Sequence, residues 1–535
     1  MADEQPAAPP ALDSDVLRAA LTAVDLAFEP EQIELMVDVA SRTHGGYAKL
    51  REPSIDNAVA PAMTFSPLVP GVEPRAVPAG PPAEGGIAAS VAAPVARPDD
   101  LAFASVCTLA GLLRSGEVSS VELTELALKR LRQIDEQLLC VVTMTDERAL
   151  EQAKARDKEL AAGKWRGPLH GIPWGAKDLL AVRGYRTTWG AGAFTEQLLD
   201  ADATVVQRLD DAGAVLTAKL TLGELAMGDR WFGGMTRNPW APDKGSSGSS
   251  AGSAAATAAG GVAFAIGSET LGSIVSPSTV CGCSSLRPTF GRVSRHGAMA
   301  LSWSMDKLGP ICRSVDDAAL VFDAIGGPDG LDASVLDVPF ELPPRVDVRG
   351  WRVGVLEKAF EEHDEHSHVL DELRALGVEL APLTLPDYPV AEMRVILTAE
   401  AAAAFDELTR SGDDRLLVGQ EENSWPNTFR AARLIPAVEY LRANRLRTQL
   451  IRDLHAAMSG VEAFVHPSFG ADALVMTNLT GHPTVVAPDG FRDEDGTPRS
   501  ISFTGQLFGE SRLLALARAW QESTDFHLRH PNLRQ

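Results

Sequence analysis

The chain has few cysteines and no long apolar run. Its 535 residues include five cysteines, which are scattered and odd in number. This usage argues against a disulfide framework and fits a reducing compartment, so we expect a cytoplasmic protein. No stretch reaches about 18 uninterrupted apolar residues, and we therefore expect no membrane span. Residues 1–15 are acidic and rich in Ala and Pro, without the basic and apolar regions of a signal peptide.

Positive charge is also scarce, because 49 Lys and Arg face 72 Asp and Glu, a formal net charge of −23. A phosphate backbone would be repelled, so nucleic acid is not expected as a partner. The arginines between residues 430 and 452 recur at helical spacing and are predicted to coat a solvated face. Cys281 and Cys283 have the wrong spacing for a zinc knuckle, so we expect no metal, and we expect no cofactor.

What the chain does have is a long succession of helical and strand-like segments. Residues 14–49 carry two helical patterns and predict a helical N-terminal extension over residues 1–62. Residues 63–100 are rich in Pro, Ala and Gly and predict a linker or a surface arm. In residues 101–535 strands alternate with helices, which predicts an α/β domain with a central mixed sheet covered by helices on both faces.

Individual elements of that domain can be placed by their apolar patterns. The expected strands are residues 213–219, 262–267, 463–467 and 484–488. The expected helices include residues 252–260, 392–410 and 430–457.

Two glycine-rich stretches contain serines in positions that suggest chemistry. Ser249 lies in a Gly-Ser run, residues 245–253, that passes directly into an Ala-rich helix and then into a strand. A flexible linker is the alternative interpretation of this composition, but linkers seldom lie between core elements. Ser273 ends a second turn, residues 269–273, straight after that strand. Backbone N–H groups in such a turn can converge on one anion, as an oxyanion hole requires.

Lys177 is the basic group that these segments offer to activate a serine. A serine hydroxyl is a weak nucleophile and must pass its proton to a base. Lysine accepts a proton only when its amine is neutral, and burial favours the neutral form. The neighbours Trp174 and Leu179 are apolar enough for burial, although a surface loop is the commoner place for a lysine. The combination predicts a hydrolase of amide bonds that uses two serines and a lysine.

Taken together, the motifs resemble the amidase signature family. Its lysine segment matches residues 171–178, its glycine-serine stretch matches residues 248–254 with Ala251 in place of one glycine, and its nucleophile turn matches residues 271–274. Further similarity lies at residues 236–240, 286–293, 308–310 and 478–483. The resemblance covers about residues 101–531 and extends to stand-alone amidases and to the A subunit of glutamyl-tRNA amidotransferase.

The resemblance implies a role for each residue of the site. Lys177 would be the base, Ser249 a relay that follows a cis peptide bond, and Ser273 the nucleophile. Because the Gly-Ser-Ser sequence is repeated, Ser246 competes with Ser249 as the relay, and only Ser249 keeps the following residues in register with the family. The oxyanion would be bound by the backbone N–H groups of Thr270, Leu271, Gly272 and Ser273.

Two positions depart from the family pattern. Leu271 replaces a glycine, which keeps the N–H available if its φ is negative. Val275 replaces an arginine, which removes a charge near the site and is expected to alter substrate choice. Neither change removes a group with a predicted chemical role.

We therefore expect an amidohydrolase that cleaves a non-peptide carboxylic amide through a serine acyl-enzyme. Neutral aryl or aliphatic amides are the expected substrates, and esters or carbamates share the same tetrahedral intermediate. The resemblance implies that the pocket is bordered by Met227, Trp231 and Phe232, and Trp303 is expected to join them; packing of the core is an equally weighted role for these side chains. The expected partner is this small molecule, and a homodimer is left open.

Two other functions remain open at this stage. One is an A-like subunit of a tRNA-dependent amidotransferase, because residues 14–60 resemble the small helical C subunit of that enzyme. The favoured interpretation of these residues is a family-specific N-terminal extension packed on the catalytic domain. The net charge of −23 and the built-in extension argue against it. The other is a non-enzymatic scaffold with a relic site, which an intact set of Lys177, Ser249 and Ser273 argues against.

Overall fold

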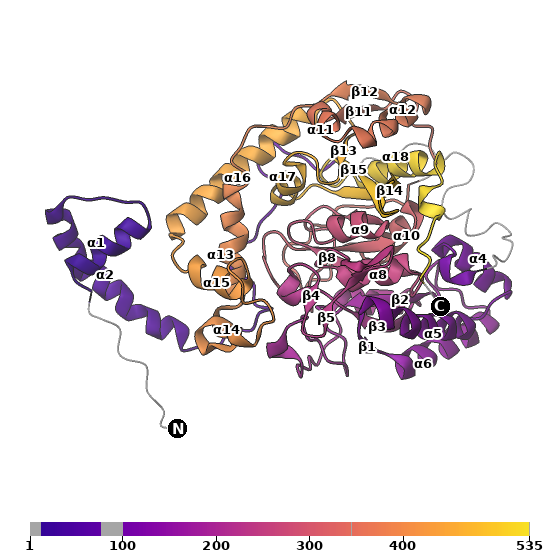
Figure 1. Ribbon diagram of the computed structural model, residues 1–535, viewed down its shortest axis with the longest axis horizontal. Helices are drawn as coiled ribbons and strands as arrows, with labels where there is room; N and C mark the ends of the chain where they lie inside the picture. Colours follow the sequence, from indigo (N-terminus) through magenta and orange to yellow (C-terminus); the bar gives the residue numbers. More distant parts are fainter. Residues whose placement is uncertain (1–11, 76–99, 344, 534–535) are drawn as a thin grey trace.

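The fold is built on one large mixed sheet, shown in Figure 1. The structure is a computed structural model that describes residues 12–75, 100–343 and 345–533. Within this part of the chain the main sheet has 11 strands in the order β1-β3-β2-β8-β10-β9-β14-β15-β13-β11-β12. These strands are β1 (Val141–Met144), β2 (Pro173–Lys177), β3 (Val215–Leu220), β8 (Phe264–Glu269), β9 (Ser284–Arg287), β10 (Lys307–Cys312), β11 (Arg352–Val355), β12 (Glu379–Pro382), β13 (Ala463–Pro467), β14 (Thr484–Phe491) and β15 (Pro498–Gly505). Short ribbons pair β4 (Arg230–Trp231) with β5 (Gly234–Met235) and β6 (Arg237–Asn238) with β7 (Ala241–Gly245).

Strand direction changes along this sheet. β2 runs parallel to both of its neighbours, β3 and β8. β10 is antiparallel to β8 and to β9, and further along β14 is antiparallel to β9 and β15. At the far end β11 runs parallel to β12 and β13. The mixed sheet that the alternation of elements predicted is therefore confirmed.

Helices cover both faces of the sheet. The helices of the described residues, of which α1 and α2 lie away from the sheet, are α1 (Ser14–Ala23), α2 (Pro30–Arg51), α4 (Val106–Ser115), α5 (Ser120–Leu138), α6 (Asp146–Ala161), α7 (Thr204–Asp211), α8 (Ala251–Ala258), α9 (Val275–Cys281), α10 (Val315–Ile325), α11 (Glu357–Glu362), α12 (His368–Ala375), α13 (Val395–Ala404), α14 (Asp406–Ser411), α15 (Trp425–Ala432), α16 (Ala437–Ala457), α17 (Ala473–Thr480) and α18 (Glu510–Glu522). Short 3-10 turns are η1 (Leu101–Phe103), η2 (Gly192–Phe194), η3 (Glu224–Ala226), η4 (Asp364–His366), η5 (Glu392–Arg394), η6 (Asp413–Leu416) and η7 (Phe526–Leu528).

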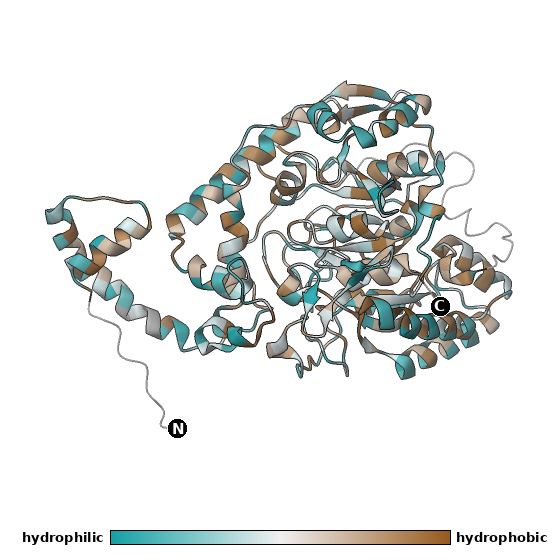
Figure 2. Cartoon of the chain, viewed as in Figure 1, coloured by the Kyte–Doolittle hydropathy of each residue, from teal (hydrophilic) through white to brown (hydrophobic). Residues whose placement is uncertain are grey.

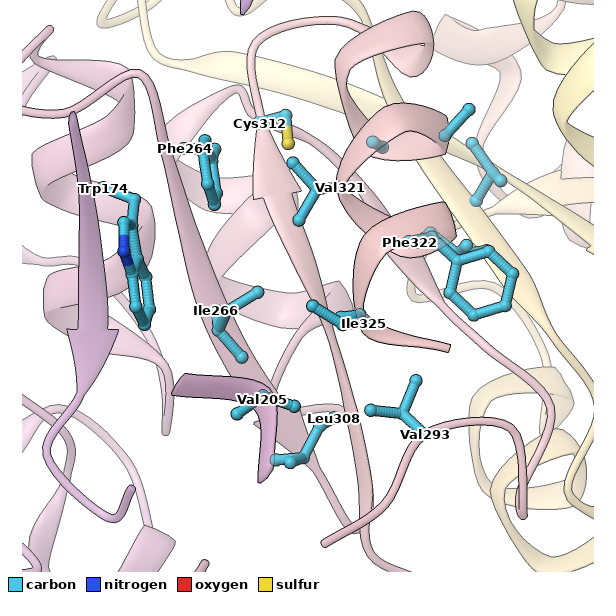
Figure 3. Packing of buried hydrophobic residues seen from close by; sticks show 14 of the residues in the cluster. Trp174, Val205, Phe264, Ile266, Val293, Leu308, Cys312, Val321, Phe322 and Ile325 are labelled. Atoms are coloured by element: carbon cyan, nitrogen blue, oxygen red, sulfur yellow. The ribbon is translucent and has the colours of Figure 1, made fainter. Parts of the chain in front are cut away.

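The two helical layers follow from alternation of side chains along the strands. Successive residues of a strand point to opposite faces. Phe264 and Ile266 of β8 therefore pack on the same side as α10, as Figure 3 shows, whereas Ala265 between them packs with Ala255 of α8. The helix α8 consists of small residues that are all buried, and it packs against β2, β3 and β8.

Some predicted elements differ from those observed. The strands expected at 213–219, 262–267 and 484–488 are shifted or longer, as β3, β8 and β14, while 463–467 matches β13. The expected helix 430–457 is broken between α15 and α16, where Pro436 cannot donate to a helical hydrogen bond and disfavours helix at the residue before it. The expected helix 392–410 is divided at Phe405, whose ring is buried against Trp189 and Phe429.

The prediction that the arginines of residues 430–452 coat a solvated face is wrong at one position. Arg447 of α16 is 1% exposed, and its guanidinium donates to the Ser304 hydroxyl at 2.9 Å and to the Ser304 carbonyl at 2.8 Å. It also donates to the Leu479 carbonyl and lies over the ring of Phe65. These contacts satisfy the buried guanidinium and link α16 to three other segments of the chain.

The N-terminal segment has a projecting part and a docked part. In Figure 1 the helices α1 and α2 extend away from the body, and Figure 2 shows apolar positions along them. Leu35 and Val39 of α2 are 79% and 57% exposed. By contrast, Val72 is buried, and Arg75 lies 3.4 Å from Glu462. The rest of the predicted linker, residues 76–99, lies outside the described residues.

In the stretches that the structure describes, no helix combines the length and the apolar character needed to cross a membrane.

Candidate active site

Lys177 is the last residue of β2 and points toward the layer that contains α8. Trp174 and Ala176 pack into the core on the α10 side, so Gly175 and Lys177 must face the other way. Gly175 confirms this direction, because a Cβ there would meet a side-chain carbon of Leu220 at 2.3 Å, and Leu220 packs with α8. The Lys177 side chain is fully buried beneath the N-terminal end of α8.

The Lys177 amine is surrounded by hydroxyl groups. It lies 2.8 Å from the Ser249 Oγ, 3.0 Å from the Ser250 Oγ and 2.8 Å from the Ser268 Oγ. Within the described residues it forms no ion pair with a carboxylate. Burial lowers the pKa of Lys177 well below its usual value, and the more distant charges of Asp306 and Glu269 oppose this shift only in part. A lowered pKa favours the neutral amine, which is the form that can accept a proton.

Ser249 lies where the resemblance puts a relay. The Gly248–Ser249 peptide bond is cis, and the Ser249 side chain is fully buried against Lys177. Glycine is required before it, since a Cβ on Gly248 would lie 1.8 Å from the Gly228 carbonyl oxygen. Ser246, the competing candidate, donates its hydroxyl to the Ser247 carbonyl at 2.9 Å. The geometry brings Ser249 and not Ser246 to the lysine.

Two serines of this cluster escaped the sequence analysis. Ser250 donates to the Ser268 carbonyl at 3.1 Å and accepts from the Ser268 backbone N–H at 3.1 Å. This reciprocal pair holds the start of α8 against β8, with both hydroxyls on the Lys177 amine. Ser268 could have been noticed, because it is the first polar side chain in the otherwise apolar strand β8. Nothing in the sequence distinguishes Ser250 from its neighbours.

Ser273 lies at the end of a turn that leads from β8 into α9. Its side chain is half-buried, and its carbonyl accepts a hydrogen bond from the Ser250 N–H at 3.1 Å, which places it beside the lysine cluster. Among the described residues, the Ser273 hydroxyl and the backbone N–H groups of residues 270–273 have no hydrogen-bond partner. Gly272 has a φ of 112°, and Leu271 is not among the residues with positive φ. The turn thus offers a free hydroxyl beside a row of free donors.

A buried carboxylate fixes this turn from behind. Glu269 Oε2 accepts from the N–H groups of Ile274 and Val275 at 2.7 Å and 2.8 Å. Its Oε1 accepts from Arg287 at 2.7 Å and from Asn478 at 2.8 Å. Arg287 and Asn478 come from two motifs that the resemblance had marked without a role. Both motifs therefore hold the first turn of α9 in place.

Burial and ion pairing act in opposite directions on the pKa of Glu269. Burial alone would raise the pKa of Glu269, but the charges of Arg287 and Lys307 outweigh it and hold that pKa below its usual value. On the other side of the turn, Thr270 donates its hydroxyl to Asp306 at 2.6 Å. The four residues with predicted oxyanion N–H groups are thus anchored at both ends.

The predicted pocket residues are not all in one place. Trp303 lines a cavity of about 190 Å³ beside Asp306. Among the described residues that line this cavity, Met227, Trp231 and Phe232 do not occur. Trp231 is 7% exposed and packs edge-on to Phe232 at 4.7 Å between ring centroids. Met227 and Phe232 are 37% and 38% exposed. Trp231 therefore packs inward, which fits the alternative role given to these side chains, packing of the core.

The fold and the buried lysine–serine cluster together define a class, a mixed α/β protein of the amidase type. The sequence profile of the Amidase family matches residues 122–474, so this chain belongs to that family.

Curated relatives and solved structures extend the comparison. The chain is 35% identical over 472 residues to the A subunit of glutamyl-tRNA(Gln) amidotransferase from Roseiflexus sp. (strain RS-1), covering 79% of this chain and 96% of that protein. It is 32% identical over 485 residues to the protein of the same name from Moorella thermoacetica, covering 81% and 99%. The peptide amidase of Stenotrophomonas maltophilia superposes with a TM-score of 0.72 at 31% identity, over 80% of this chain and 98% of that one.

Proposed function

We propose that this protein cleaves the C–N bond of a carboxylic amide through a serine acyl-enzyme. The observation that carries the proposal is the buried amine of Lys177, 2.8 Å from the Ser249 hydroxyl. A lysine in this setting is a base rather than a cation, because burial favours its neutral form. The N-terminal end of α8 adds to the effect, since a helix N-terminus carries partial positive charge and disfavours a second cation.

In the first half of the proposed reaction the Ser273 oxygen attacks the carbonyl carbon of the amide. A C–O bond forms as the Ser273 proton passes to Ser249, while the Ser249 proton passes to Lys177. The carbonyl oxygen becomes an anion and is held by the backbone N–H groups of residues 270–273. These donors are already in position, because Glu269 and Asp306 fix the two ends of the turn.

The second half returns the proton and releases the products. As the C–N bond breaks, the leaving nitrogen takes up a proton that comes back from Lys177 through Ser249, and ammonia or an amine departs. An ester then joins the acyl group to Ser273. Water attacks that ester with the same relay as base, and the carboxylic acid leaves with Ser273 restored.

The physiological role within this chemistry has two candidates. The stand-alone amidase is supported by likeness to the peptide amidase, by the net charge of −23 and by the extension within the chain. The A-like amidotransferase role, in which the protein would release ammonia from glutamine, is supported by the two curated relatives described above, which carry that name. These relatives support the amidotransferase role more strongly than the stand-alone one.

The setting proposed for either role is the cytoplasm. All five cysteines are free, and four of them are buried. A small-molecule amide is the proposed partner.

Ammonia release from purified protein tests the proposal and separates the two roles. The panel is benzamide, hexanamide and glutamine, with Ser273→Ala as the inactive control. Release from any of them that Ser273→Ala abolishes supports the acyl-enzyme. A higher kcat/KM for glutamine than for benzamide or hexanamide favours the amidotransferase role, and the reverse favours a stand-alone amidase. Turnover that survives Ser273→Ala would overturn the proposed chemistry.

A further inference from the structure

A tight turn at the end of the N-terminal extension is fastened to the catalytic body. Asp56 forms the turn by accepting the Ala58 N–H on its side chain at 2.8 Å and the Val59 N–H on its carbonyl at 2.9 Å. The Asn57 carboxamide then clamps Ala300, accepting its N–H at 2.7 Å and donating to its carbonyl at 2.9 Å. A side chain that pairs with both backbone groups of one residue fixes the turn in register on that residue.

This turn closes one side of the cavity that contains Trp303. The cavity has a volume of about 190 Å³, and Ala58 and Ala60 line it from the extension. Met299, Trp303 and Asp306 are among the residues that line it from the body. Asp306 accepts a hydrogen bond from the Thr270 hydroxyl. The cavity is therefore separated by one side chain from the turn of residues 270–273, which carries the free N–H donors.

The lining favours a neutral and apolar occupant. Arg295 is paired with Asp332 at 2.9 Å and donates to the Trp303 carbonyl at 2.6 Å. Asp306 already accepts from Leu301 N–H at 2.8 Å as well as from Thr270. Arg295, Asp332 and Asp306 therefore have partners within the wall. Besides the polar His296, the methyl groups, the thioether and the indole remain to meet a ligand.

The size of the cavity indicates the size of the group. A cavity of about 150 Å³ lined by apolar side chains holds benzene, and this one is somewhat larger. A flat indole face suits a flat substituent, because aromatic rings stack with an offset or meet edge to face.

We infer that the N-terminal turn forms the outer wall of the substrate site, and that the cavity behind Ala58 and Ala60 holds a neutral, phenyl-sized substituent of the amide. This inference rests on the proposed function, since the substituent must be attached to a carbonyl that reaches Ser273. Ala58 and Ala60 are then specificity-determining residues, although they lie far in sequence from the lysine and serine motifs. Their small size is what leaves the room.

The test fills the cavity from the extension and compares two substrates. Ala58→Trp is the test variant. Val59→Trp is its matched control, because Val59 lies in the same turn, is 57% exposed and does not line the cavity. We expect Ala58→Trp to lower the ratio of kcat/KM for benzamide to kcat/KM for acetamide by about tenfold or more. The same ratio in Val59→Trp should stay within about twofold of wild type.

A second variant tests the clamp rather than the volume. Asn57→Ala removes both contacts to Ala300, so the wall should loosen and a larger amide, 2-naphthamide, should gain relative to benzamide. Equal ratios in Ala58→Trp, Val59→Trp and wild type would overturn the inference, as would a naphthamide preference unmoved by Asn57→Ala. Labelling of the wild-type protein by a fluorophosphonate tests the proposed function separately. If Ser273 is not labelled, the proposed function is wrong, and the inference about the wall, which rests on it, is wrong as well.

Discussion

Two buried lysines on neighbouring strands have opposite surroundings. Lys177 ends β2, and Lys219 lies on β3 beside it, opposite Ala176 in the parallel ladder. Both side chains are fully buried. Lys219 lies 2.6 Å from Asp178 Oδ1 and donates to the Thr187 hydroxyl at 2.5 Å, whereas Lys177 meets three serine hydroxyls and no carboxylate within the described residues.

The difference in partners determines what each amine can do. Burial lowers the pKa of both lysines, but the charge and hydrogen bond of Asp178 oppose that shift at Lys219. Lys219 is therefore suited to remain a cation in a structural ion pair. Lys177 has only distant carboxylates, so its neutral form is favoured, as the proposed role of base requires. The comparison teaches that the immediate partner, rather than burial alone, separates a base from a structural cation.

The largest effect is expected at Lys177 and the two serines that we propose act with it. Ser273→Ala should abolish turnover, and Lys177→Ala and Ser249→Ala should each lower kcat by on the order of 10³-fold or more. The losses in the double variant should not add, because the three groups act as one relay. Kinetics of the single and double variants check this. Ser246→Ala is the control, and activity lost there but retained in Ser249→Ala would show that the relay assignment is wrong.

Lys219 should respond in stability rather than in chemistry. Lys219→Met leaves Asp178 buried without its cation, which costs about 3–5 kcal/mol of folding free energy. Adding Asp178→Asn should recover part of that loss, since the unpaired charge is removed. Denaturant unfolding of both variants measures the effect. If Lys219→Met unfolds like wild type but loses activity as Lys177→Ala does, the assignment of a structural role to Lys219 is wrong.

Glu269 gives an intermediate case, because it supports the turn without facing the substrate. Glu269→Gln keeps the shape but removes the charge that pairs with Arg287 at 2.7 Å. We expect kcat to fall by about 10- to 100-fold, with little change in KM, as the N–H donors of the turn lose their alignment. Steady-state kinetics separate the two constants. A large rise in KM with kcat unchanged would instead point to a role in substrate binding.

The smallest effect is expected at Ser250, which shares the amine but has no role in the proposed proton path. Ser250→Ala removes one of the three hydroxyls around Lys177 and should lower kcat by about tenfold or less. Steady-state kinetics beside Ser249→Ala make the measurement. A loss as large as that of Ser249→Ala would mean that the two serines share the relay.

The sequence predicts the sheet and the meeting of Lys177 with Ser249 better than it predicts the residues that support them. Strand signals at β13 and β14 are strong because these segments are buried, apolar runs. Lys177, Ser249 and Ser273 could be named because the order of motifs fixes their register. Arg287 and Asn478 had no assigned role, since their meeting at Glu269 depends on the spatial neighbours of β8 and β9, which no local pattern encodes.

The extension was hardest to interpret from the sequence. Its helical periodicity predicts α1 and α2, but not where the following turn lies. Asn57 is a single polar residue, and its clamp on Ala300 spans 243 positions of the chain. The two missed helix breaks have different causes. Pro436 is a local signal in the sequence that ends the run before α16, whereas the break at Phe405 accompanies burial of its ring against Phe429.

The most direct test of the central claim is the pH dependence of Ser273 modification by a fluorophosphonate, which requires no knowledge of the substrate. If neutral Lys177 is the base, protonation at low pH must block the relay. The second-order rate constant should then rise with pH through a single ionisation and level off, with an apparent pKa well below the usual lysine value of about 10.4. The rise should disappear in Lys177→Ala. A rate that is flat from pH 5 to pH 10 in the wild-type protein would contradict lysine as the base.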